Sequence, residues 1–326
     1  MNEKILINRL PVRTWNRLGV NAAEIEWKVE NGAAQQTEEI AAHADGAPIR
    51  LDVTDDSGSE QTFSVTAREG SHVTVFECCT AKEPQLVRLT LDIAKDASVR
   101  LVQLLNPDCG AALRHEIQAE CADGGSFDII SVMLGSGDIY SDTRTELIGD
   151  KSSFSAEVAY LVRGCDTVDC NIAVNHYGKS TESRINAAGA IADSGKKIFR
   201  GTIDFKNGSA DSVGCENETV LMLGENAVNK TVPLILCAEE NVEGTHGASI
   251  GELDADTLFY FESRGISKAA AEQIMARAAI DRLIGMTGDS AFADSAAAAL
   301  GEVLDCCNDG REKQGQKITN GTFRCL

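Results

Sequence analysis

The chain lacks any run of apolar residues that could cross a membrane. None of its apolar stretches approaches the roughly 20 residues that a transmembrane helix needs. Its first four residues are polar, and the short apolar run 5–7 is interrupted at once by Asn8 and Arg9, which is unlike a secretion signal. We therefore expect a cytoplasmic protein.

Basic residues are scarce relative to acidic ones. The 326 residues include 30 Lys and Arg against 50 Asp and Glu, which gives a formal net charge of −20. Such a surface repels nucleic-acid phosphates and anionic lipids, so we expect neither a nucleic acid nor a membrane as a direct partner. The same charge is also what an ordinary soluble surface carries.

Metal-binding cysteine spacings are absent although the chain has 11 cysteines. Two pairs are adjacent, Cys78–Cys79 and Cys306–Cys307, and Cys165 and Cys170 are the next closest, but no CxxC occurs. This argues against a structural zinc site or a resident ferredoxin-type cluster. We expect most of these thiols to behave as small buried apolar groups, with one or two left open for chemistry.

Alternating apolar and polar residues dominate the region from residue 48 to residue 253. The pattern is clearest over residues 113–121, 154–162, 168–176 and 199–205, and the apolar run 232–237 closes the series. A period of two predicts strands with one buried and one solvated face, and turn signals such as Asn207-Gly208 separate them. Pro233 suits a strand start or an edge. No helical pattern intervenes, so a sandwich, a barrel and a β-solenoid all remain open, although tandem repeats are absent.

Helical patterns begin after residue 253. Asp254 and Ser267 are suited to cap helices, and Arg264-Gly265 is suited to end the first of them. A second helix is predicted with Ala271, Ile274 and Ala278 on one face beside Met275, Ala279 and Leu283, and a third follows with Phe292 and Leu300. We thus predict three parts: an N-terminal segment 1–47, a β core 48–253 and a helical domain 254–326.

Three motifs were weighed for chemistry. Residues 173–180 match a loose phosphate-loop pattern, but a strand rather than a helix is predicted to follow, so we reject nucleotide binding there. His115 and His176 lie on apolar strand faces and are interpreted as hydrogen-bonded core histidines. His246 stands between Thr245 and Gly247, where small neighbours permit close approach of a ligand or another backbone. A neutral imidazole can bind iron, although His246 could equally only close the last strand.

Two segments carry a family resemblance, Gly244-Thr245-His246-Gly247-Ala248-Ser249 and Leu258 to Ile266, supported by residues 199–203, 210–211 and 220–223. Together they resemble the C-terminal signature of the SufB/SufD family of iron–sulfur cluster assembly scaffolds. The resemblance implies a right-handed parallel β-helix core with a C-terminal helical domain. SufD proteins often have cysteine where this chain has Gly244, and SufB proteins have glutamate where it has Gly247, which favours a SufD-like identity.

The resemblance also implies a function and partners. The chain would be a non-enzymatic SufD-like scaffold that pairs with a SufB-like subunit or with itself, with His246, Thr245 and Gly247 at the dimer interface where a transient iron–sulfur cluster forms. His246 would be a metal ligand. The ABC-type ATPase SufC would dock on residues of the first helix and its end: Phe259, Tyr260, Phe261, Arg264 and Gly265. A sulfur donor protein could join them, and any flavin would belong to the whole complex.

Two alternatives remain beside this interpretation. A β-solenoid enzyme acting on carbohydrates would require paired acidic residues on one β face, export and few free thiols. A structural assembly protein without cluster chemistry would keep the partners and lose the role of His246.

Overall fold

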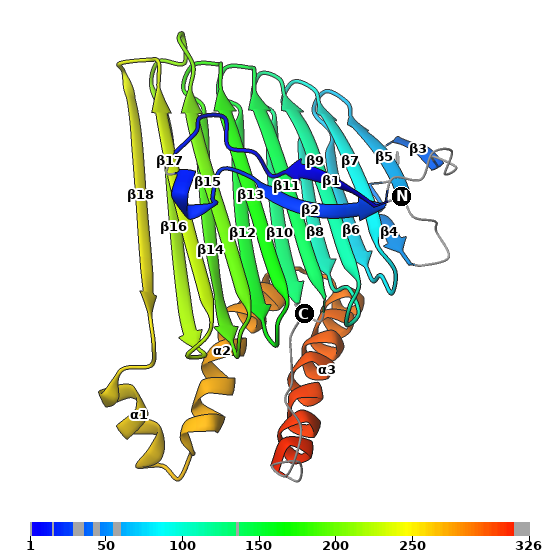
Figure 1. Cartoon of the computed structure of the whole chain (residues 1–326). Helices are drawn as coiled ribbons and strands as arrows, with labels where there is room; N and C mark the ends of the chain where they lie inside the picture. Colours follow the sequence, from blue (N-terminus) through cyan, green and yellow to red (C-terminus); the bar gives the residue numbers. More distant parts are fainter. Residues whose placement is uncertain are drawn as a thin grey trace.

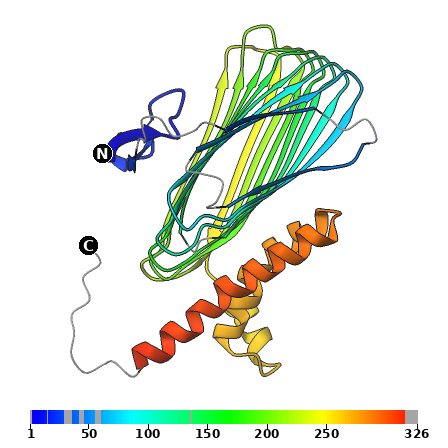
Figure 2. The same ribbon diagram turned by 90° about the vertical axis from the view of Figure 1, so that its right-hand side faces the viewer.

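The computed structural model describes residues 2–14, 16–28, 36–41, 46–54, 60–134 and 137–315. Within them, two eight-stranded sheets face each other, and successive strands of the chain alternate between the two (Figures 1 and 2). Neighbouring strands in each sheet are parallel, so the chain coils as a flattened solenoid. The predicted parallel β-helix with C-terminal helices is confirmed.

The two sheets are named here by their strands. The even sheet contains β4 (Ile49–Val53), β6 (His72–Cys79), β8 (Ser98–Leu105), β10 (Ser126–Leu134), β12 (Ser153–Val162), β14 (Glu182–Ala192), β16 (Ser212–Leu223) and β18 (Val242–Gly251). The odd sheet contains β3 (Gln36–Ala41), β5 (Glu60–Ala67), β7 (Gln85–Ile93), β9 (Ala112–Cys121), β11 (Asp138–Leu147), β13 (Thr167–His176), β15 (Lys196–Phe205) and β17 (Val228–Cys237).

Alternation in the sequence produces the core between the sheets. Every second residue of a strand points inward, so Leu113 and Ile117 of β9 meet Phe127 and Ile129 of β10 in one buried cluster. The four segments with the clearest alternation lie in β9, β12, β13 and β15, and the apolar run 232–237 lies in β17. Pro233 lies in β17, the edge strand of the odd sheet, where a missing N–H donor can be tolerated.

Tight corners between strands stack from coil to coil. Asp96, Lys151 and Asp211 have φ between 54° and 63°, and Gly124 has φ 63°. Left-handed backbone is tolerated by Asp and Gly better than by most residues, which explains the Asp- and Gly-rich turn signals. At one corner the Asp123 carboxylate accepts a hydrogen bond from the backbone N–H of the next coil, 2.9 Å from Asp150 N.

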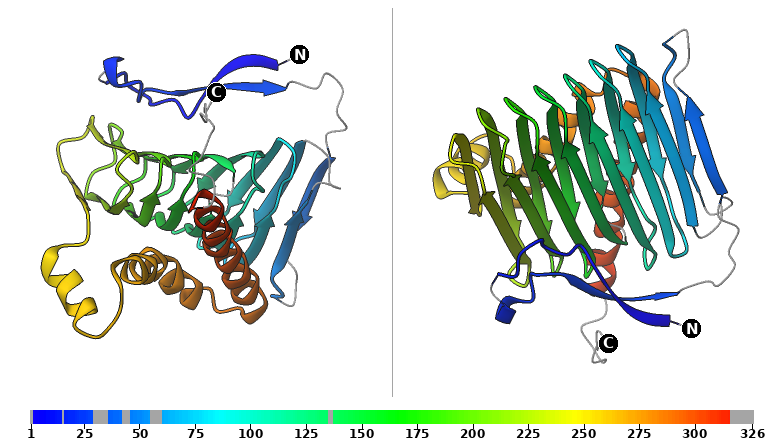
Figure 3. Two further views of the ribbon diagram at one scale, coloured as in Figure 1. Left: turned by 60° about the horizontal axis from the view of Figure 1, so that its bottom comes forward. Right: turned by 90° about the horizontal axis from the view of Figure 1, so that it is seen from above.

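An N-terminal strap covers part of the outer face of the odd sheet (Figure 3). It contains the antiparallel pair β1 (Asn2–Ile7) and β2 (Ala23–Lys28) and the short 3-10 helix η1 (Asn16–Leu18). Trp27 packs against Leu86, while Leu10 and Val20 pack against Val232. The strap therefore closes one apolar area that the outer face of a solenoid would otherwise expose.

Three helices follow β18: α1 (Ala255–Glu262), α2 (Lys268–Met286) and α3 (Ser290–Gly315). Helices α2 and α3 pack against the even sheet, on the side of the solenoid away from the strap (Figures 2 and 3). The predicted caps are confirmed, because Asp254 and Ser267 accept hydrogen bonds from the N–H groups of Thr257 and Ala270. Gly265, with φ 78°, lies in the turn that follows α1. No helix among the described residues is long and apolar enough to cross a membrane.

The buried face of α2 differs in part from the prediction. Ala271 and Leu283 are buried as expected, but Ile274 is 43% exposed and the packed face is completed by Ala276 and Ile280. These residues contact the outward apolar side chains of the even sheet. Alanine residues occur on all sides of α2, so the sequence alone offers several similar apolar faces. Contact with the even sheet selects one of them.

Candidate functional site

The solenoid ends on two strands that each have a neighbour on one side only. β17 is the last strand of the odd sheet and β18 is the last strand of the even sheet (Figure 1). β18 is 10 residues long and no residue in it is buried. A parallel edge strand presents unpaired backbone donors and acceptors, so this open end is a surface ready for pairing.

The predicted residues Thr245, His246 and Gly247 lie in the middle of β18. Thr245 and His246 are exposed and Gly247 is half-buried. In the parallel register His246 is paired with Glu216 of β16, and parallel neighbours point to the same side of a sheet. The structure thus places the predicted histidine beside a carboxylate that the sequence analysis did not select.

Gly244 has a packing reason that the sequence did not reveal. A Cβ atom at this position would lie 2.9 Å from Ile235 Cγ2 and 3.2 Å from Phe205 Cε2, both in the odd sheet. This contact also shows that Gly244, and therefore His246 two residues later, point into the solenoid. A cysteine at position 244 would require Ile235 to move.

A buried ionic network lies directly behind the open end. Glu218 is 2% exposed and forms an ion pair with Lys197, which is 0% exposed. Tyr160 Oη donates to Glu218 Oε1 at 3.0 Å, and Thr231 Oγ1 donates to Glu218 Oε2 at 2.6 Å. Burial lowers the pKa of Lys197, while the neighbouring Glu218 opposes that change. Three side chains, those of Lys197, Tyr160 and Thr231, therefore compensate the buried charge of Glu218.

Glu216 is the member of this region without such compensation. It is 1% exposed, and its Oε2 atom has no hydrogen-bond partner among the described residues. Burial, together with the nearby charge of Glu218, raises the pKa of Glu216 to about 8. Its carboxylate lies against Gly201 of β15, where a Cβ would come within 2.4 Å of Glu216 Cδ. Gly201 therefore provides the space that this side chain occupies.

A second polar cluster lies deep inside the first coils. Glu77, Cys79 and His115 place ligand-type atoms within 4.8 Å of one another, and all three are 0% exposed. His115 Nε2 is 3.0 Å from Glu77 Oε1, and Gln103 Nε2 donates to Glu77 Oε2 at 3.2 Å. Burial raises the pKa of the Cys79 thiol well above its usual value, and the Glu77 charge adds to this.

This cluster has the donor set of a metal site. A thiolate, an imidazole and a carboxylate at such distances suit zinc or ferrous iron. Two buried atoms around it, His115 Nδ1 and Gln103 Oε1, have no hydrogen-bond partner among the described residues. No spacing motif reveals this cluster, because Glu77 and His115 lie 38 residues apart in the chain. One signal could have shown it: Glu77 occupies an inward position two residues before Cys79.

One row of inward side chains joins the two polar regions. The strand registers align Glu77, Gln103, Ser131, Val158, Ala187 and Glu218 across six strands of the even sheet. Val158 and Ala187 are the apolar part of this row. The enclosed cluster and the network behind the open end thus lie at the same level of the core.

His176 fits the interpretation as a core histidine. It is 0% exposed, hydrogen-bonded to Thr181 Oγ1 at 2.7 Å and Ser183 Oγ at 2.9 Å, and stacked near Phe205. Burial lowers its pKa to about 4. The phosphate-loop pattern at residues 173–180 is followed by strand β14, so the helix that a phosphate loop needs is absent at that place.

The residues predicted to dock an ATPase lie on α1 and just beyond it. Phe259 is 72% exposed and Tyr260 is 54% exposed, whereas Phe261 is half-buried and contacts the Tyr260 ring edge-on. The Arg264 guanidinium lies 3.6 Å from the Tyr260 ring centroid, and Gly265 follows it. Helix α1 has no buried residue. Phe259 and Tyr260 are therefore exposed to solvent on α1. This helix lies just beyond the end of β18 (Figure 1).

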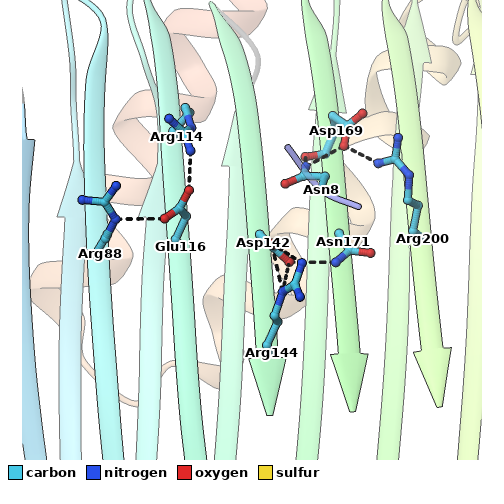
Figure 4. Close-up of polar contacts among 9 residues, drawn as sticks. All are labelled: Asn8, Arg88, Arg114, Glu116, Asp142, Arg144, Asp169, Asn171 and Arg200. Carbon is cyan, nitrogen blue, oxygen red and sulfur yellow. Dashed lines mark hydrogen bonds and ion pairs between the residues drawn. The ribbon is translucent and has the colours of Figure 1, made fainter. Parts of the chain in front are cut away.

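Charged residues on the outer face of the odd sheet are bound to one another (Figure 4). Glu116 is paired with Arg88 and Arg114, and Asp142 is paired with Arg144 and accepts a hydrogen bond from Asn171 at 2.7 Å. Further along, a buried ion pair joins Asp169 to Arg200, and Asn8 of the strap donates to Asp169 Oδ1 at 2.6 Å. These carboxylates act as structural partners of the strap and the sheet.

The fold and the two interior polar regions define a parallel β-solenoid with inward ligand-type side chains and an open, histidine-bearing end. Comparison with known proteins identifies the family to which the chain belongs. The model of the SufBD core domain of SUF-system iron–sulfur cluster assembly matches residues 50–279. That match covers most of the solenoid together with α1 and most of α2, and the chain therefore belongs to the SufBD family.

Individual relatives agree with this assignment. The chain is 32% identical to the iron-sulfur cluster assembly protein SufD of Bacillus subtilis over 143 residues, which are 44% of this chain and 33% of that protein. It is 23% identical to SufD of Escherichia coli over 298 residues, 86% of this chain and 70% of that protein. A chloroplastic SufBD family protein, ABCI8 of Arabidopsis thaliana, is 24% identical over 242 residues, 67% of this chain and 41% of that protein.

The predicted membership of the SufB/SufD family and the SufD-like character are confirmed. Several of these relatives are matched over less than half of their own length. The chain thus belongs to the SufBD family of iron–sulfur cluster assembly, and its role, partners and site residues are proposals.

Proposed function

We propose that the chain is a scaffold subunit of a SUF assembly complex. It pairs through β18 with a SufB-like subunit or with a second copy, and it binds a SufC-type ATPase through α1. The observation that carries this proposal is the open end: a 10-residue parallel edge strand without a buried residue, bearing His246. An edge of this length invites pairing with another chain.

His246 is proposed to contact the cluster, which is the cargo of the complex. It points inward at the open end, next to Glu216 and in front of the Lys197–Glu218 ion pair. An imidazole there can bind iron while a partner strand supplies further ligands. The enclosed Glu77, Cys79 and His115 cluster is a second place where iron or sulfur can be held.

Helix α1 is proposed to transmit the movement of the ATPase. Phe259 and Tyr260 are large, exposed and adjacent, which is the composition that interface cores favour. The helix follows β18 after three residues, so a displacement of α1 is passed directly to the edge strand and to His246. A cytoplasmic setting and a transient cluster fit this role.

The carbohydrate-enzyme alternative has less support. Glycoside hydrolysis needs two carboxyl groups available to substrate on one surface. On the outer face of the odd sheet, Glu116 and Asp142 are bound to arginines, and Asp169 is buried beneath the strap (Figure 4). The SufBD family is also one of assembly proteins.

Co-purification tests the partners. The untagged chain is isolated from native extract, and an ABC ATPase and a SufB-like chain or a second copy are sought by mass spectrometry. The double change Phe259→Ser and Tyr260→Ser is expected to lose the ATPase, whereas Leu6→Ser, a change at another exposed apolar residue, is not. If the ATPase is absent from the wild-type preparation, the proposal is wrong.

The pairing strand needs its own variant. Thr245→Lys with Gly247→Lys adds two charges to β18 and is expected to separate the dimer in size-exclusion chromatography. Thr66→Lys with Thr90→Lys adds the same charge to exposed positions of β5 and β7 and serves as the control. Separately, His246→Ala is tested for cluster delivery in cells. Full delivery by that variant would leave the assembly role without cluster chemistry.

A further inference from the structure

The polar cluster enclosed by the first coils takes its ligand-type side chains from both sheets. Glu77 and Cys79 stand two residues apart on β6, so both point into the core, and His115 reaches them from β9 of the odd sheet. His115 Nε2 lies 3.0 Å from Oε1 and 2.9 Å from Oε2 of Glu77. All three side chains are fully buried, and their donor atoms lie within 4.8 Å of one another. The three groups are therefore in direct side-chain proximity across the core.

The Glu77 carboxylate has no Lys or Arg partner among the residues that the structure describes. The buried Lys and Arg side chains of this part of the chain are each paired with a different carboxylate: Arg163 with Asp193, Lys197 with Glu218 and Arg200 with Asp169. A carboxylate removed from water is costly unless a positive charge compensates it. A bound cation would supply that charge to Glu77.

A divalent ion would make this cluster electrically neutral. The Glu77 carboxylate and a Cys79 thiolate carry one negative charge each, and the imidazole of His115 carries none, so a doubly charged cation leaves no net charge in the core. Binding replaces the thiol proton, which passes to solvent, by a metal–sulfur bond. Neutrality matters here because Cys79 and its strand neighbour Leu105 both belong to the large apolar cluster between the sheets.

A fourth donor is available on β8. Gln103 is 1% exposed, its Nε2 atom donates to Glu77 Oε2 at 3.2 Å, and its Oε1 atom has no hydrogen-bond partner among the described residues. Zinc accepts sulfur, nitrogen and oxygen ligands together in a tetrahedron, at bond lengths that place the donor atoms about 3.3–3.6 Å apart. Donor atoms that already lie within 4.8 Å of one another reach this spacing by small side-chain rotations.

We propose that Glu77, Cys79 and His115 bind one resident Zn²⁺ ion, with Gln103 completing a closed four-coordinate site. The ion joins β6 and β8 of the even sheet to β9 of the odd sheet, near the end of the solenoid where β3 and β4 are only 6 and 5 residues long. It fastens the two sheets together at that end. The absence of a CxxC motif does not bear on such a site, because its ligands come from three strands.

Metal content of the full-length chain tests the site. The chain is purified without a metal-binding tag and without chelators, and zinc is measured by inductively coupled plasma mass spectrometry. We expect about one Zn²⁺ per chain in the wild type and less than about 0.1 in Cys79→Ser and in His115→Gln. Cys121→Ser changes another fully buried thiol of the same core and is expected to keep the ion. Zinc that is absent from the wild type, or retained in full by both ligand variants, would overturn the proposal.

Cobalt reveals the ligand types directly. The chain is produced in zinc-depleted medium with added Co²⁺, and its absorption spectrum is recorded. We expect the intense visible bands of tetrahedral cobalt together with a thiolate-to-cobalt charge-transfer band in the near ultraviolet. Cys79→Ser should lose the charge-transfer band and Cys121→Ser should keep it. A wild-type spectrum with only weak octahedral bands contradicts the proposal, and that result does not depend on whether any variant folds.

Exchange of the ion needs no variant and separates a resident ion from cargo. Because the ligands are fully buried, the ion leaves only when the coils open, so we expect release to a chromophoric chelator to be at least about 100-fold slower in buffer than in guanidinium chloride. Equal rates in the two conditions would place the zinc on the surface and refute the assignment. Iron in place of zinc, released from the folded chain as fast as from the unfolded one, would indicate cargo and also refute it.

The zinc site does not rest on the proposed function, and the outcomes keep the two apart. If one slowly exchanging Zn²⁺ is found but no ATPase or partner chain co-purifies, the site stands and the proposed function fails. If the complex assembles and His246→Ala blocks cluster delivery while the chain contains no zinc and shows no thiolate-to-cobalt band, the proposed function stands and the zinc site is refuted.

Discussion

The two polar regions inside the solenoid differ in one respect above all, which is access. Glu77, Cys79 and His115 are surrounded by coils on both sides and are fully buried. Glu216 and Glu218 lie one strand from the end, and His246 beside them is exposed. Both regions use inward positions of the same sheet, so the difference comes from the number of coils that cover them and not from the local strand geometry.

This comparison teaches what a solenoid does with buried polar groups. In the enclosed region, the polar atoms depend on one another or on a bound group, because full burial separates them from bulk solvent. At the open end, water, an ion or a partner strand can complete what the chain leaves unsatisfied. The enclosed region is suited to holding a group, and the open end is suited to exchanging one.

Thiol reactivity tests the contrast most strongly. Cys237 is exposed on β17 at the open end, whereas Cys79 is fully buried and the pKa of its thiol is raised by burial. Because a core residue reacts only after local or global opening, we expect Cys79 to react with a maleimide at least about 10³-fold more slowly than Cys237. The measurement is time-resolved alkylation with peptide mass spectrometry. Comparable rates would show that the first coils are open.

The next largest effect is expected from Lys197. Replacing it by Met leaves Glu218 buried and unpaired, which should lower the free energy of unfolding by about 3–5 kcal/mol. Denaturant unfolding of Lys197→Met measures this, and the double variant Lys197→Met with Glu218→Gln should recover most of the loss. A single variant as stable as the wild type would show that water already reaches the network from the open end.

Acid sensitivity is expected from His176, which is fully buried in the core of the solenoid. Its folded-state pKa of about 4 lies below the ordinary value of 6.5, so the unfolded chain binds the proton first as pH falls. The stabilisation is present above about pH 6.5 and is lost as pH falls toward 4, by up to about 3 kcal/mol.

Comparing two variants isolates the histidine from other acid effects. The difference in unfolding free energy between wild type and His176→Asn should shrink over this pH window, because Asn does not titrate. His72→Asn, at an exposed histidine, is expected to leave the pH profile unchanged. A pH-independent difference for His176→Asn would mean that water hydrates the ring.

The smallest effects come from a matched pair of hydrogen-bond deletions. Gln103→Leu removes a donor to Glu77 in the enclosed region, and we expect a cost of about 1–3 kcal/mol because nothing replaces it. Thr231→Val removes a donor to Glu218 near the open end, where water can substitute, and we expect less than about 1 kcal/mol. Thermal unfolding of both variants checks the order, and the reverse order would contradict the assignment of dry and wet regions.

Much of the architecture could be predicted before the structure was known. The alternation in residues 113–121 and 168–176, the turn residues and the capping residues Asp254 and Ser267 identified strands, corners and helix starts. They did so because side-chain direction and capping depend on a few neighbouring residues. The choice of a solenoid over a sandwich or a barrel came only from the family resemblance, since all three folds share the same alternation of apolar and polar residues.

The sites were predicted less completely. His246 and the α1 aromatic residues were found from their motifs, and they await the experiments above. Glu216, Glu218 and the Glu77, Cys79 and His115 cluster were missed, because a charged residue at an inward position looks like an interruption of the pattern until its neighbour is known. The buried face of α2 was partly wrong for a similar reason: several faces are apolar, and only contact with the even sheet selects one.

By itself, the order of residues along this chain determined where strands and helices begin, which side chains point inward and that the surface is strongly acidic. Those properties follow from interactions within a few residues. The coiling of successive strands decided which inward groups meet: it joined Glu77 to His115 from 38 residues away and set Glu216 beside His246 at an uncovered end. Contacts of that range depend on the register of whole coils, which no local pattern specifies.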